Sequence, residues 1–320
     1  NKEVSDHYGD CVIKSLIKSK FNPKLLIIKA GEDQKNQSSI DLIHDAAYEA
    51  RLERGSLMIA LGGGVIGDMT GFAAATWLRG IHVVQIPTTL LAMVDASIGG
   101  KTGINHSKGK NLIGAFHQPK LVLIDPNTLS TLPSREFKAG MAEIIKYGVI
   151  SDLELFELLE RQNNISDFST IKEKLLIEII KRSAKSKAEI VVKDEKESGV
   201  RAFLNYGHTF GHVIENLCGY GKWLHGEAVA MGMVAVGQLA VQRGLWREID
   251  TERQKQLIEK AGLPSKWPKL EIRSVISSLR GDKKVKNGKV TFVMPLKIGD
   301  VKLFNNISNE EIHECLHKIS

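Results

Sequence analysis

Leu57-Met-Ile-Ala-Leu-Gly-Gly-Gly-Val-Ile-Gly-Asp68 decides the fold, because an apolar run passes directly into a glycine-rich turn and then into a helical pattern. Gly62, Gly64 and Gly67 give the spacing G-x-G-x-x-G between a strand and a helix. Glycines there let the backbone approach a pyrophosphate, and the first N–H groups of the helix point at it. The stretch therefore predicts a dinucleotide site, while a plain strand-to-helix turn explains a lone motif equally well.

The acidic residue expected about 20 residues further on, for the ribose hydroxyls, is missing from this sequence. The next strand reads Val83-Val-Gln-Ile86 instead. The ribose of a dinucleotide must then be held by other groups, and Glu32 and Lys35 are candidates. An ordinary polar turn is the competing interpretation of the segment that contains them.

Short apolar runs alternate with helical patterns around this stretch, which is typical of βαβ units and a mostly parallel sheet. The runs that indicate strands lie at 25–28, 57–61, 83–86 and 121–124, and helical patterns lie at 40–54 and 67–79. After about Pro133 the pattern becomes helical, at 136–149, 171–192, 227–243 and 252–261, and only 289–294 indicates a strand. The sequence predicts an α/β N-terminal Rossmann-like domain with a parallel sheet over 1–134, then a mainly α-helical metal-binding domain over 135–320.

Composition limits the class of protein. The 320 residues are 42% hydrophobic, which is enough for two domains with their own cores. Lys and Arg exceed Asp and Glu by 44 to 37, but they are scattered and aromatics are only 6%, so we expect a small anionic substrate and no nucleic acid. Cys11, Cys218 and Cys315 are widely separated, which predicts free thiols and the cytoplasm. We expect no membrane partner, because no apolar run reaches about 18 residues and no signal peptide opens the chain.

Histidines indicate a metal. Gly207-His-Thr-Phe-Gly-His212 places His208 and His212 on one face of a helix, and His225 follows within Leu224-His-Gly-Glu227. Imidazoles with a carboxylate suit a divalent metal. A lone histidine is more often a surface or hydrogen-bonded core residue, but the flanking glycines leave room for something else.

The carboxylate ligand is not fixed by spacing. Glu143 lies in an apolar helical pattern, where an unpaired acid would be costly to bury. A salt bridge with Lys146, one turn on, is the competing interpretation of Glu143.

An anion site is also indicated. Asp95-Ala-Ser-Ile-Gly-Gly-Lys-Thr102 is preceded by Thr88-Thr89 and followed by Gly109-Lys-Asn111. Repeated glycine beside lysine and small hydroxyls suits a phosphate or another oxyanion. Exposed glycine-rich loops with stray lysines are common, so this segment is weak evidence alone.

Taken together, these segments closely resemble the 3-dehydroquinate synthase family of sugar-phosphate cyclases. The resemblance lies in the order, spacing and residue identities of the segments 62–68, 87–89, 94–102, 109–111, 141–146, 201–212 and 224–227. It implies an NAD-binding α/β domain, a mainly helical metal domain, a homodimer and a site in a cleft. The opening strands of that family are absent from this sequence, and with them a carboxylate expected near the adenosine ribose.

The resemblance also implies residue roles. Glu143, His208 and His225 are expected to bind zinc or cobalt, and His212 to relay protons instead. The implied NAD contacts are Glu32, Lys35, Gly64, Val65, Gly67, Asp68, Thr88, Thr89, Lys101, Lys110, Thr128 and Thr131. The implied substrate contacts are Asp95, Lys101, Asn111, Lys146, Lys187, Arg201, Asn205, His212 and one of Lys283 and Lys284, with Arg79 reaching the substrate phosphate in the neighbouring subunit.

The implied reaction converts 3-deoxy-D-arabino-heptulosonate 7-phosphate into 3-dehydroquinate and phosphate in the shikimate pathway of aromatic amino acid biosynthesis. It proceeds by NAD-dependent oxidation, β-elimination of phosphate, re-reduction, ring opening and an intramolecular aldol step. The alternatives are another sugar-phosphate cyclase, a metal-dependent polyol or alcohol dehydrogenase, and a nucleotide-binding regulatory module without activity. Another cyclase is disfavoured by the Gly99-Gly-Lys101 segment, which matches the dehydroquinate synthase pattern. The many lysines suited to anions argue against a dehydrogenase, and the intact histidines argue against an inactive regulatory module.

Overall fold

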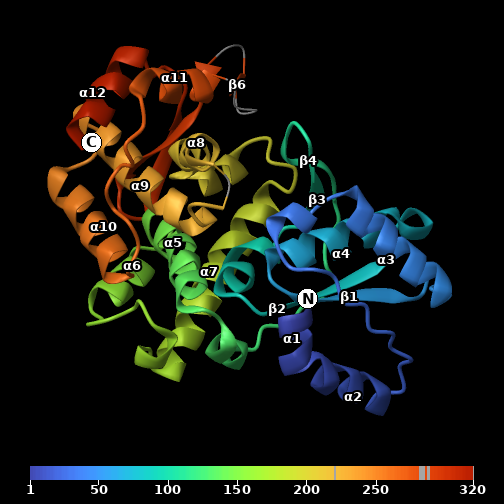
Figure 1. The fold of residues 1–320 in the computed structure, drawn as a ribbon. Coiled ribbons are helices and arrows are strands. Elements are labelled where there is room, and N and C mark those ends of the chain that lie inside the picture. The colour runs from blue at the N-terminus through green and yellow to red at the C-terminus, as the bar shows by residue number, and fades with distance from the viewer. Residues whose placement is uncertain (220, 281–284, 287–288, 320) are drawn as a thin grey trace. The chain divides into compact units, whose positions relative to one another are not determined.

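The computed structural model describes residues 1–219, 221–280, 285–286 and 289–319. The chain divides into two compact units, Asn1–Leu132 and Pro133–Ser320, which Figure 1 colours from blue to green and from green to red. Lys283 and Lys284, which we expected near the substrate, lie outside the described residues.

The first unit contains a parallel sheet with the strand order β1-β2-β5. These strands are Leu57–Gly62, His82–Pro87 and Leu121–Val122, and both neighbouring pairs run parallel. Helix α4, Gly64–Thr76, connects β1 to β2 and packs on both of them. This βαβ unit confirms the predicted Rossmann-like α/β architecture, because a crossover helix is what parallel neighbours require.

Helices cover this sheet in the first unit (Figure 1). Helix α3, Gln37–Glu49, begins after Asn36, whose side-chain oxygen accepts a hydrogen bond from a main-chain N–H three residues on. The apolar face of α3 shares one core with α4 and with the buried face of the sheet. Two further helices, α1 at Lys2–Val4 and α2 at Asp10–Lys18, precede α3.

Two details predicted for the first unit are wrong. Residues 25–28 form no strand, since no described segment pairs with them, and Leu25 is 54% exposed although Ile28 is buried. An apolar run becomes a strand only where a neighbour completes its hydrogen bonds. Conversely, the segment predicted as a glycine-rich loop contains an antiparallel hairpin of β3, Lys101–His106, and β4, Gly109–Phe116.

The second unit is mainly helical, as predicted. Its helices are α5 (Ser134–Ile150), α6 (Leu153–Glu160), α7 (Glu173–Lys193), α8 (His208–Cys218), α9 (His225–Gln242), α10 (Glu248–Lys260), α11 (Ile272–Arg280) and α12 (Asn309–Ile319). Its strands form two antiparallel pairs, β6 (Val285–Lys286) with β7 (Lys289–Val290) and β8 (Phe292–Lys297) with β9 (Asp300–Phe304). The prediction of a single strand here was wrong. Strand β9 gives little signal because few of its side chains are buried.

Helix α9 is the centre of the second unit and packs against α5, α8, α10 and α12. Glycines allow the start of α8 and helix α5 to approach α9 so closely that backbone atoms are in contact. A Cβ added at Gly232 would lie 2.0 Å from the carbonyl oxygen of Gly207, and one at Gly226 would lie 1.9 Å from that of Ala139 on α5. These two crossings hold the first turns of α8 and α9 beside α5.

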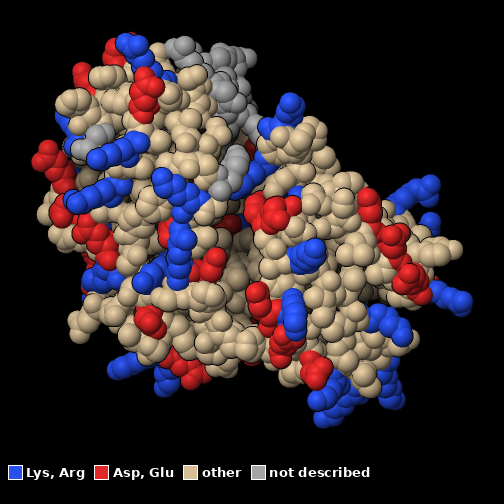
Figure 2. Space-filling view, viewed as in Figure 1, with Lys and Arg blue, Asp and Glu red and all other residues tan. Residues whose placement is uncertain are grey.

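Charged side chains of both signs are interspersed over the face of the molecule shown in Figure 2. Several arginines of the second unit form ion pairs with neighbouring acids, including Arg182 with Asp152 and Arg253 with Glu160, each at 2.7 Å. Some of the arginines that contribute to the positive net charge therefore stabilise the fold through ion pairs. No helix of the described chain combines the length and apolar character needed to cross a bilayer.

The glycine crossing can be tested by substitution. Gly232→Ala should lower the free energy of unfolding by about 2 kcal/mol, because overpacking costs about 1–3 kcal/mol. Helix propensity alone would act in the opposite direction, by about 1 kcal/mol. The matched control is Gly55→Ala, where an added Cβ meets nothing within 4 Å. Urea unfolding followed by circular dichroism measures both variants, and an unchanged or higher stability of Gly232→Ala would contradict the close crossing.

Candidate metal centre and dinucleotide site

A buried carboxylate forms the base of the candidate metal centre in the second unit. Glu143 is 0% exposed on α5, and Lys146, one turn on, is 1% exposed. The ammonium of Lys146 pairs with Oε2 of Glu143, so the salt bridge considered as the competing interpretation exists. Apart from this ammonium, no described group donates a hydrogen bond to either oxygen of Glu143. A carboxylate this deeply buried requires further compensation, which a metal ion provides.

Two imidazoles face this carboxylate. His208 and His225 are the first residues of α8 and α9. Their Nε2 atoms lie 3.5 Å and 3.9 Å from Oε1 of Glu143. Donor atoms around a tetrahedral ion with bonds of about 2.0–2.1 Å are about 3.3 Å apart. The donor set and its spacing therefore fit one divalent metal ion such as zinc or cobalt.

His212 belongs to a second, overlapping group of possible ligands. His212, Glu215 and His225 offer donor atoms within 4.8 Å of one another, as do Glu143, His208 and His225. The rings of His208 and His212 are in an edge-on arrangement with centroids 5.7 Å apart. The spacing argument paired His208 with His212, but these two histidines fall in different groups. The group with Glu143 contains the more deeply buried carboxylate, 0% exposed against 8% for Glu215.

Tyr206 fixes the orientation of the His208 ring through the nitrogen that faces away from Glu143. The carbonyl oxygen of Tyr206 lies 3.0 Å from Nδ1 of His208. The phenol of Tyr206 donates a 2.6 Å hydrogen bond to Gln254, whose amide donates in turn to the carbonyl of Met233 on α9. Complete burial raises the pKa of the Tyr206 phenol well above its ordinary value, so the phenol remains a donor. This chain of hydrogen bonds connects the start of α8 to α9.

The start of α9 is fixed by a second network. Glu227 accepts a hydrogen bond from the main-chain N–H of Leu224, so a side chain in the first turn of α9 fixes the residue just before His225. Arg135, in the first turn of α5, donates to both oxygens of Glu227 at 2.7 Å. Our sequence reasoning missed Arg135, Glu227 and Glu215. The spacing of Glu215, seven residues after His208 and three after His212, is a signal that could have found it.

A turn before α8 carries two of the expected substrate residues. Arg201 is 1% exposed, its main-chain N–H donates to Asp194, and its guanidinium donates to the carbonyl of Glu195. Backbone hydrogen bonds, first that of Ser198, lower the pKa of Asp194 to about 2. Asn205 donates a 2.8 Å hydrogen bond to Glu197. Asp194 is therefore ionised at neutral pH and accepts hydrogen bonds from this turn.

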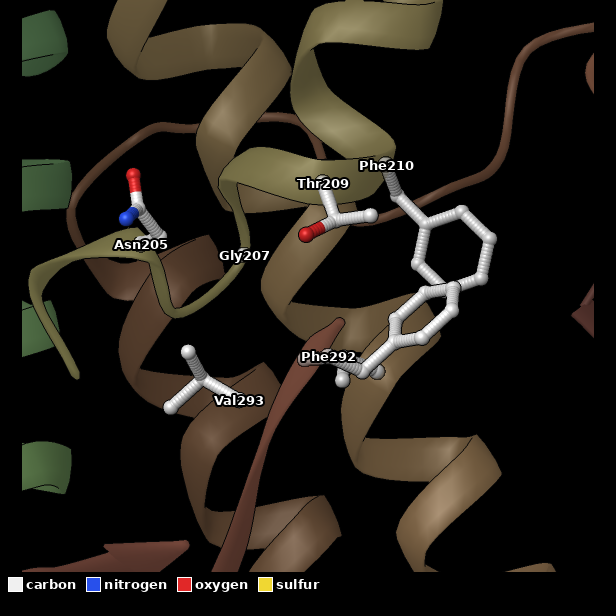
Figure 3. A pocket seen from close by; sticks show the side chains of 7 residues that line it. Asn205, Gly207, Thr209, Phe210, Phe292 and Val293 are labelled. Atoms are coloured by element: carbon white, nitrogen blue, oxygen red, sulfur yellow. The ribbon is translucent and has the colours of Figure 1, made fainter. Parts of the chain in front are cut away.

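The opposite face of α8 packs into the core. Thr209 and Phe210 line a small hollow with Asn205, Gly207, Phe292 and Val293 (Figure 3). The rings of Phe210 and Phe292 pack with centroids 5.3 Å apart. Figure 3 shows Thr209 and Phe210 directed toward β8. Helix α8 thus buries one face and presents the positions of His208, His212 and Glu215, spaced four and three residues apart, on another.

Lys187 on α7 is also buried, with 6% exposure. Helix α7 packs against α5 and against the turn that carries Arg201. The second unit therefore brings together the metal candidates and gathers Lys146, Lys187 and Arg201 on adjoining elements.

In the first unit, the glycine-rich turn is close-packed. Helix α4 begins at Gly64, and a Cβ at Gly63 would lie 3.0 Å from the methyl group of Thr89. The main-chain N–H of Thr88 donates to the carbonyl of Gly62, but the buried Thr88 hydroxyl has no hydrogen-bond partner among the described residues. A buried hydroxyl without a partner beside a helix N-terminus fits a ligand with polar groups, as a dinucleotide has.

Gln85 stands near the position where the ribose acid was expected. Its side-chain amide donates a 3.1 Å hydrogen bond to the carbonyl of Gly67. A Cβ at Gly67 would lie 2.7 Å from the Gln85 side chain. Gln85 therefore ties β2 to α4, and a side chain at position 67 would displace the Gln85 amide from this contact.

A polar cluster joins several expected cofactor contacts. The Lys35 ammonium is 2.5 Å from Asp68 and 2.6 Å from the amide oxygen of Asn111. Asn105 donates to Glu32 and accepts from the main-chain N–H of Asn111. Sequence reasoning placed Asn111 with the substrate, and the structure joins it to residues expected at the cofactor.

The other expected residues of the first unit are more dispersed. Gly99 and Gly100, with φ of 97° and 66°, form the turn before Lys101, which is exposed at the start of β3. Arg79 is exposed and follows Leu78 in a stretch where both residues have left-handed φ values, 48° and 68°. The remaining positions are Asp95 in a π-helical turn, Val65 in α4, Lys110 in β4, and Thr128 and Thr131, both in contact with Tyr8.

Comparison with known proteins identifies similar chains. Residues 25–139 match the family 3-dehydroquinate synthase N-terminal, and residues 140–285 match 3-dehydroquinate synthase C-terminal. The chain is 92% identical to a 3-dehydroquinate synthase of Prochlorococcus marinus (strain NATL2A), over all of this chain and 87% of that protein.

Solved structures of two cyclases are also similar. The 2-epi-5-epi-valiolone synthase of Streptomyces hygroscopicus subsp. jinggangensis 5008, with NAD+ and Zn2+ bound, has a TM-score of 0.91 and 31% identity, over 99% of this chain and 88% of that one. A 2-deoxy-scyllo-inosose synthase complexed with carbaglucose-6-phosphate, NAD+ and Co2+ has a TM-score of 0.86 and 28% identity, over 97% and 88%.

Substitution of His212 distinguishes the two possible ligand groups. We expect His212→Ala to retain one metal ion per chain, whereas His225→Ala should weaken metal binding at least about tenfold, because three protein ligands leave little redundancy. Metal content is measured by mass spectrometry after zinc loading and removal of excess ion. Loss of the ion from His212→Ala would assign it to the group with Glu215 instead.

Proposed function

This chain belongs to the 3-dehydroquinate synthase family, and we propose that it converts 3-deoxy-D-arabino-heptulosonate 7-phosphate into 3-dehydroquinate and phosphate. The full-length likeness to a 3-dehydroquinate synthase is the observation that carries this choice of substrate. The buried Glu143 with two facing imidazoles supports a metal-dependent reaction. The reaction belongs to the shikimate pathway, which supplies aromatic amino acids.

We propose that the first unit holds NAD and the second unit holds zinc or cobalt. The cofactors of the two similar cyclase structures support this assignment. When bound, the metal lowers the pKa of substrate hydroxyls, and the nicotinamide accepts one hydride and returns it.

The glycine-rich turn is proposed to receive the pyrophosphate, with Gly64, Val65 and Gly67 in the helix and the Thr88 hydroxyl donating to the ligand. The polar cluster around Lys35 is proposed to hold the ribose side. Glu32, Lys35, Asp68, Thr89, Lys101, Lys110, Thr128 and Thr131 complete the proposed cofactor contacts.

Glu143, His208 and His225 are the proposed metal ligands. His212 lies one turn from His208 on the same helix and is proposed to move a proton at the substrate. An imidazole can both accept and donate a proton, which suits transfer in both directions, as ring opening and ring closure require.

The buried cations are proposed to hold the anionic substrate. Arg201 offers a planar fork of N–H donors for a carboxylate or phosphate, and its guanidinium is fixed by the carbonyl of Glu195. Lys146 and Lys187 add positive charge, and their burial strengthens its effect on a bound anion. Asp95, Lys101, Asn111, Asn205 and one of Lys283 and Lys284 are the other proposed substrate contacts.

We further propose that the enzyme is a homodimer in the cytoplasm, in which Arg79 reaches the substrate phosphate of the partner subunit. The backbone supports a special role for Arg79, because two successive non-glycine residues in the left-handed region are strained. The three free cysteines suit a reducing compartment.

A redox balance tests the proposed reaction. If the hydride leaves the substrate and returns to it, NAD is needed but not consumed. We expect one phosphate for each carbocyclic product, with reduced nicotinamide never exceeding the enzyme concentration. Phosphate release and nicotinamide absorbance are followed in the same cuvette. Reduced nicotinamide that accumulates in proportion to product would reject the cyclase function and favour a polyol dehydrogenase.

Mixed dimers test the role of Arg79. Chains with Arg79→Ala and chains with His212→Ala are each expected to be inactive alone. If Arg79 serves the partner's site, random exchange of the two should restore about a quarter of wild-type activity, because half of the dimers are mixed and each has one complete site. If Arg79 acts within its own subunit, no mixture recovers activity.

A further inference from the structure

We propose that Glu215 is a positioning residue of the metal centre: its carboxylate accepts the Nδ1–H of His225 and so directs the Nε2 lone pair of that ring toward the ion. The inference rests on the proposed metal site and concerns a residue outside the expected ligand set. Glu215 lies on α8, on the face that carries His208 and His212.

The two nitrogens of His225 face two different carboxylates. Nδ1 lies 3.4 Å from Oε2 of Glu215, within reach of a long hydrogen bond, and Nε2 lies 3.9 Å from Oε1 of Glu143. A neutral imidazole carries one proton, and the partner of one nitrogen decides which nitrogen remains free to bind a metal. A proton held at Nδ1 by Glu215 leaves Nε2 available on the side of Glu143.

His208 shows the same arrangement with a different acceptor. Its Nδ1 lies 3.0 Å from the carbonyl of Tyr206, and its Nε2 lies 3.5 Å from Oε1 of Glu143. A carbonyl can only accept, so Nδ1 of His208 carries the proton. Both histidines therefore direct Nε2 at the same carboxylate oxygen, and Glu215 does for His225 what Tyr206 does for His208.

Burial gives the contact its strength. The side chain of Glu215 is 9% exposed and that of His225 is 34% exposed, so water competes little for the carboxylate. A negative acceptor also makes the bound imidazole a stronger donor to a metal than a neutral carbonyl does.

The test compares metal binding in Glu215→Gln with that in wild type. The glutamine keeps the size of the side chain but removes the charge. Competition with a chromophoric chelator for Zn2+ should show affinity about 10–100-fold weaker, still with one ion per chain. The absorption spectrum of the Co2+-loaded variant should keep wild-type band positions, because the ligands are unchanged.

Asp250→Asn is the matched control. Asp250 is another buried carboxylate of the second unit, with 2% exposure, and it pairs with Arg247 and Arg253 far from the histidines in sequence. Its substitution should affect stability but not metal affinity. If both variants lower metal affinity equally, the effect of Glu215→Gln is a general loss of packing, and the inference fails.

The tautomer provides a second measurement that does not depend on metal loading. Nitrogen-15 chemical shifts of the histidine rings in the metal-free protein should show His225 protonated at Nδ1 in the wild type. An Nε2–H ring in the wild type would overturn the proposal, even if the variant proved too unstable for metal titration.

The remaining outcomes separate this inference from the proposed function. If wild type binds metal and turns over substrate but Glu215→Gln binds metal equally well, only the positioning role is rejected. If Glu215→Gln loses stoichiometric binding as His225→Ala does and the Co2+ bands shift, Glu215 is a ligand and the positioning role is again rejected. A wild-type protein that binds no metal would reject the proposed function itself.

Discussion

The second unit is organised around one buried charge, the carboxylate of Glu143. Burying an ion in an apolar helical interior costs several kcal/mol, and the ion pair with Lys146 offsets part of this cost, while no other described group donates a hydrogen bond to the carboxylate. A divalent ion held by Glu143 with His208 and His225 would supply the missing compensation. The metal is then part of the stability of this unit as well as of its chemistry, since an ion that binds the folded state stabilises it by mass action.

Helix packing places His208 and His225 beside the carboxylate of Glu143. Both stand at the first position of a helix, where a small rotation of the entry turn would move the ring by several ångströms. The fold prevents such rotation with backbone contacts at Gly226 and Gly232 and with the Arg135–Glu227 pair at the start of α9. Side chains packed against each other can adjust, whereas backbone contacts leave little freedom. This explains why glycines surround the histidine motif.

Local periodicity was enough to predict β1, α4 and β2, because an apolar run, a glycine turn and a helical pattern follow each other within one βαβ unit. It failed at residues 25–28, where hydrophobicity predicted a strand that has no described neighbour to pair with. It also failed in the hairpin of β3 and β4, whose glycines hide the alternation of side chains. For the candidate site, helical spacing placed His208 and His212 on one face and burial cost drew attention to Glu143, but only the resemblance chose Glu143 over a salt-bridge role, because the contact of α5 with α8 and α9 is long-range.

The two candidate sites manage their polar groups in opposite ways. In the first unit, Lys35, Asp68 and Asn111 satisfy one another, as do Glu32 and Asn105. A ligand that binds there has to exchange these hydrogen bonds for its own, so the net gain from each polar contact is small. In the second unit, Glu143 has an ion pair with Lys146 and no hydrogen bond from any other described group, so a bound cation adds to the compensation of this buried carboxylate. A ligand of the first candidate site thus replaces existing polar contacts, whereas a cation at the second adds a charge that the buried carboxylate can still accept.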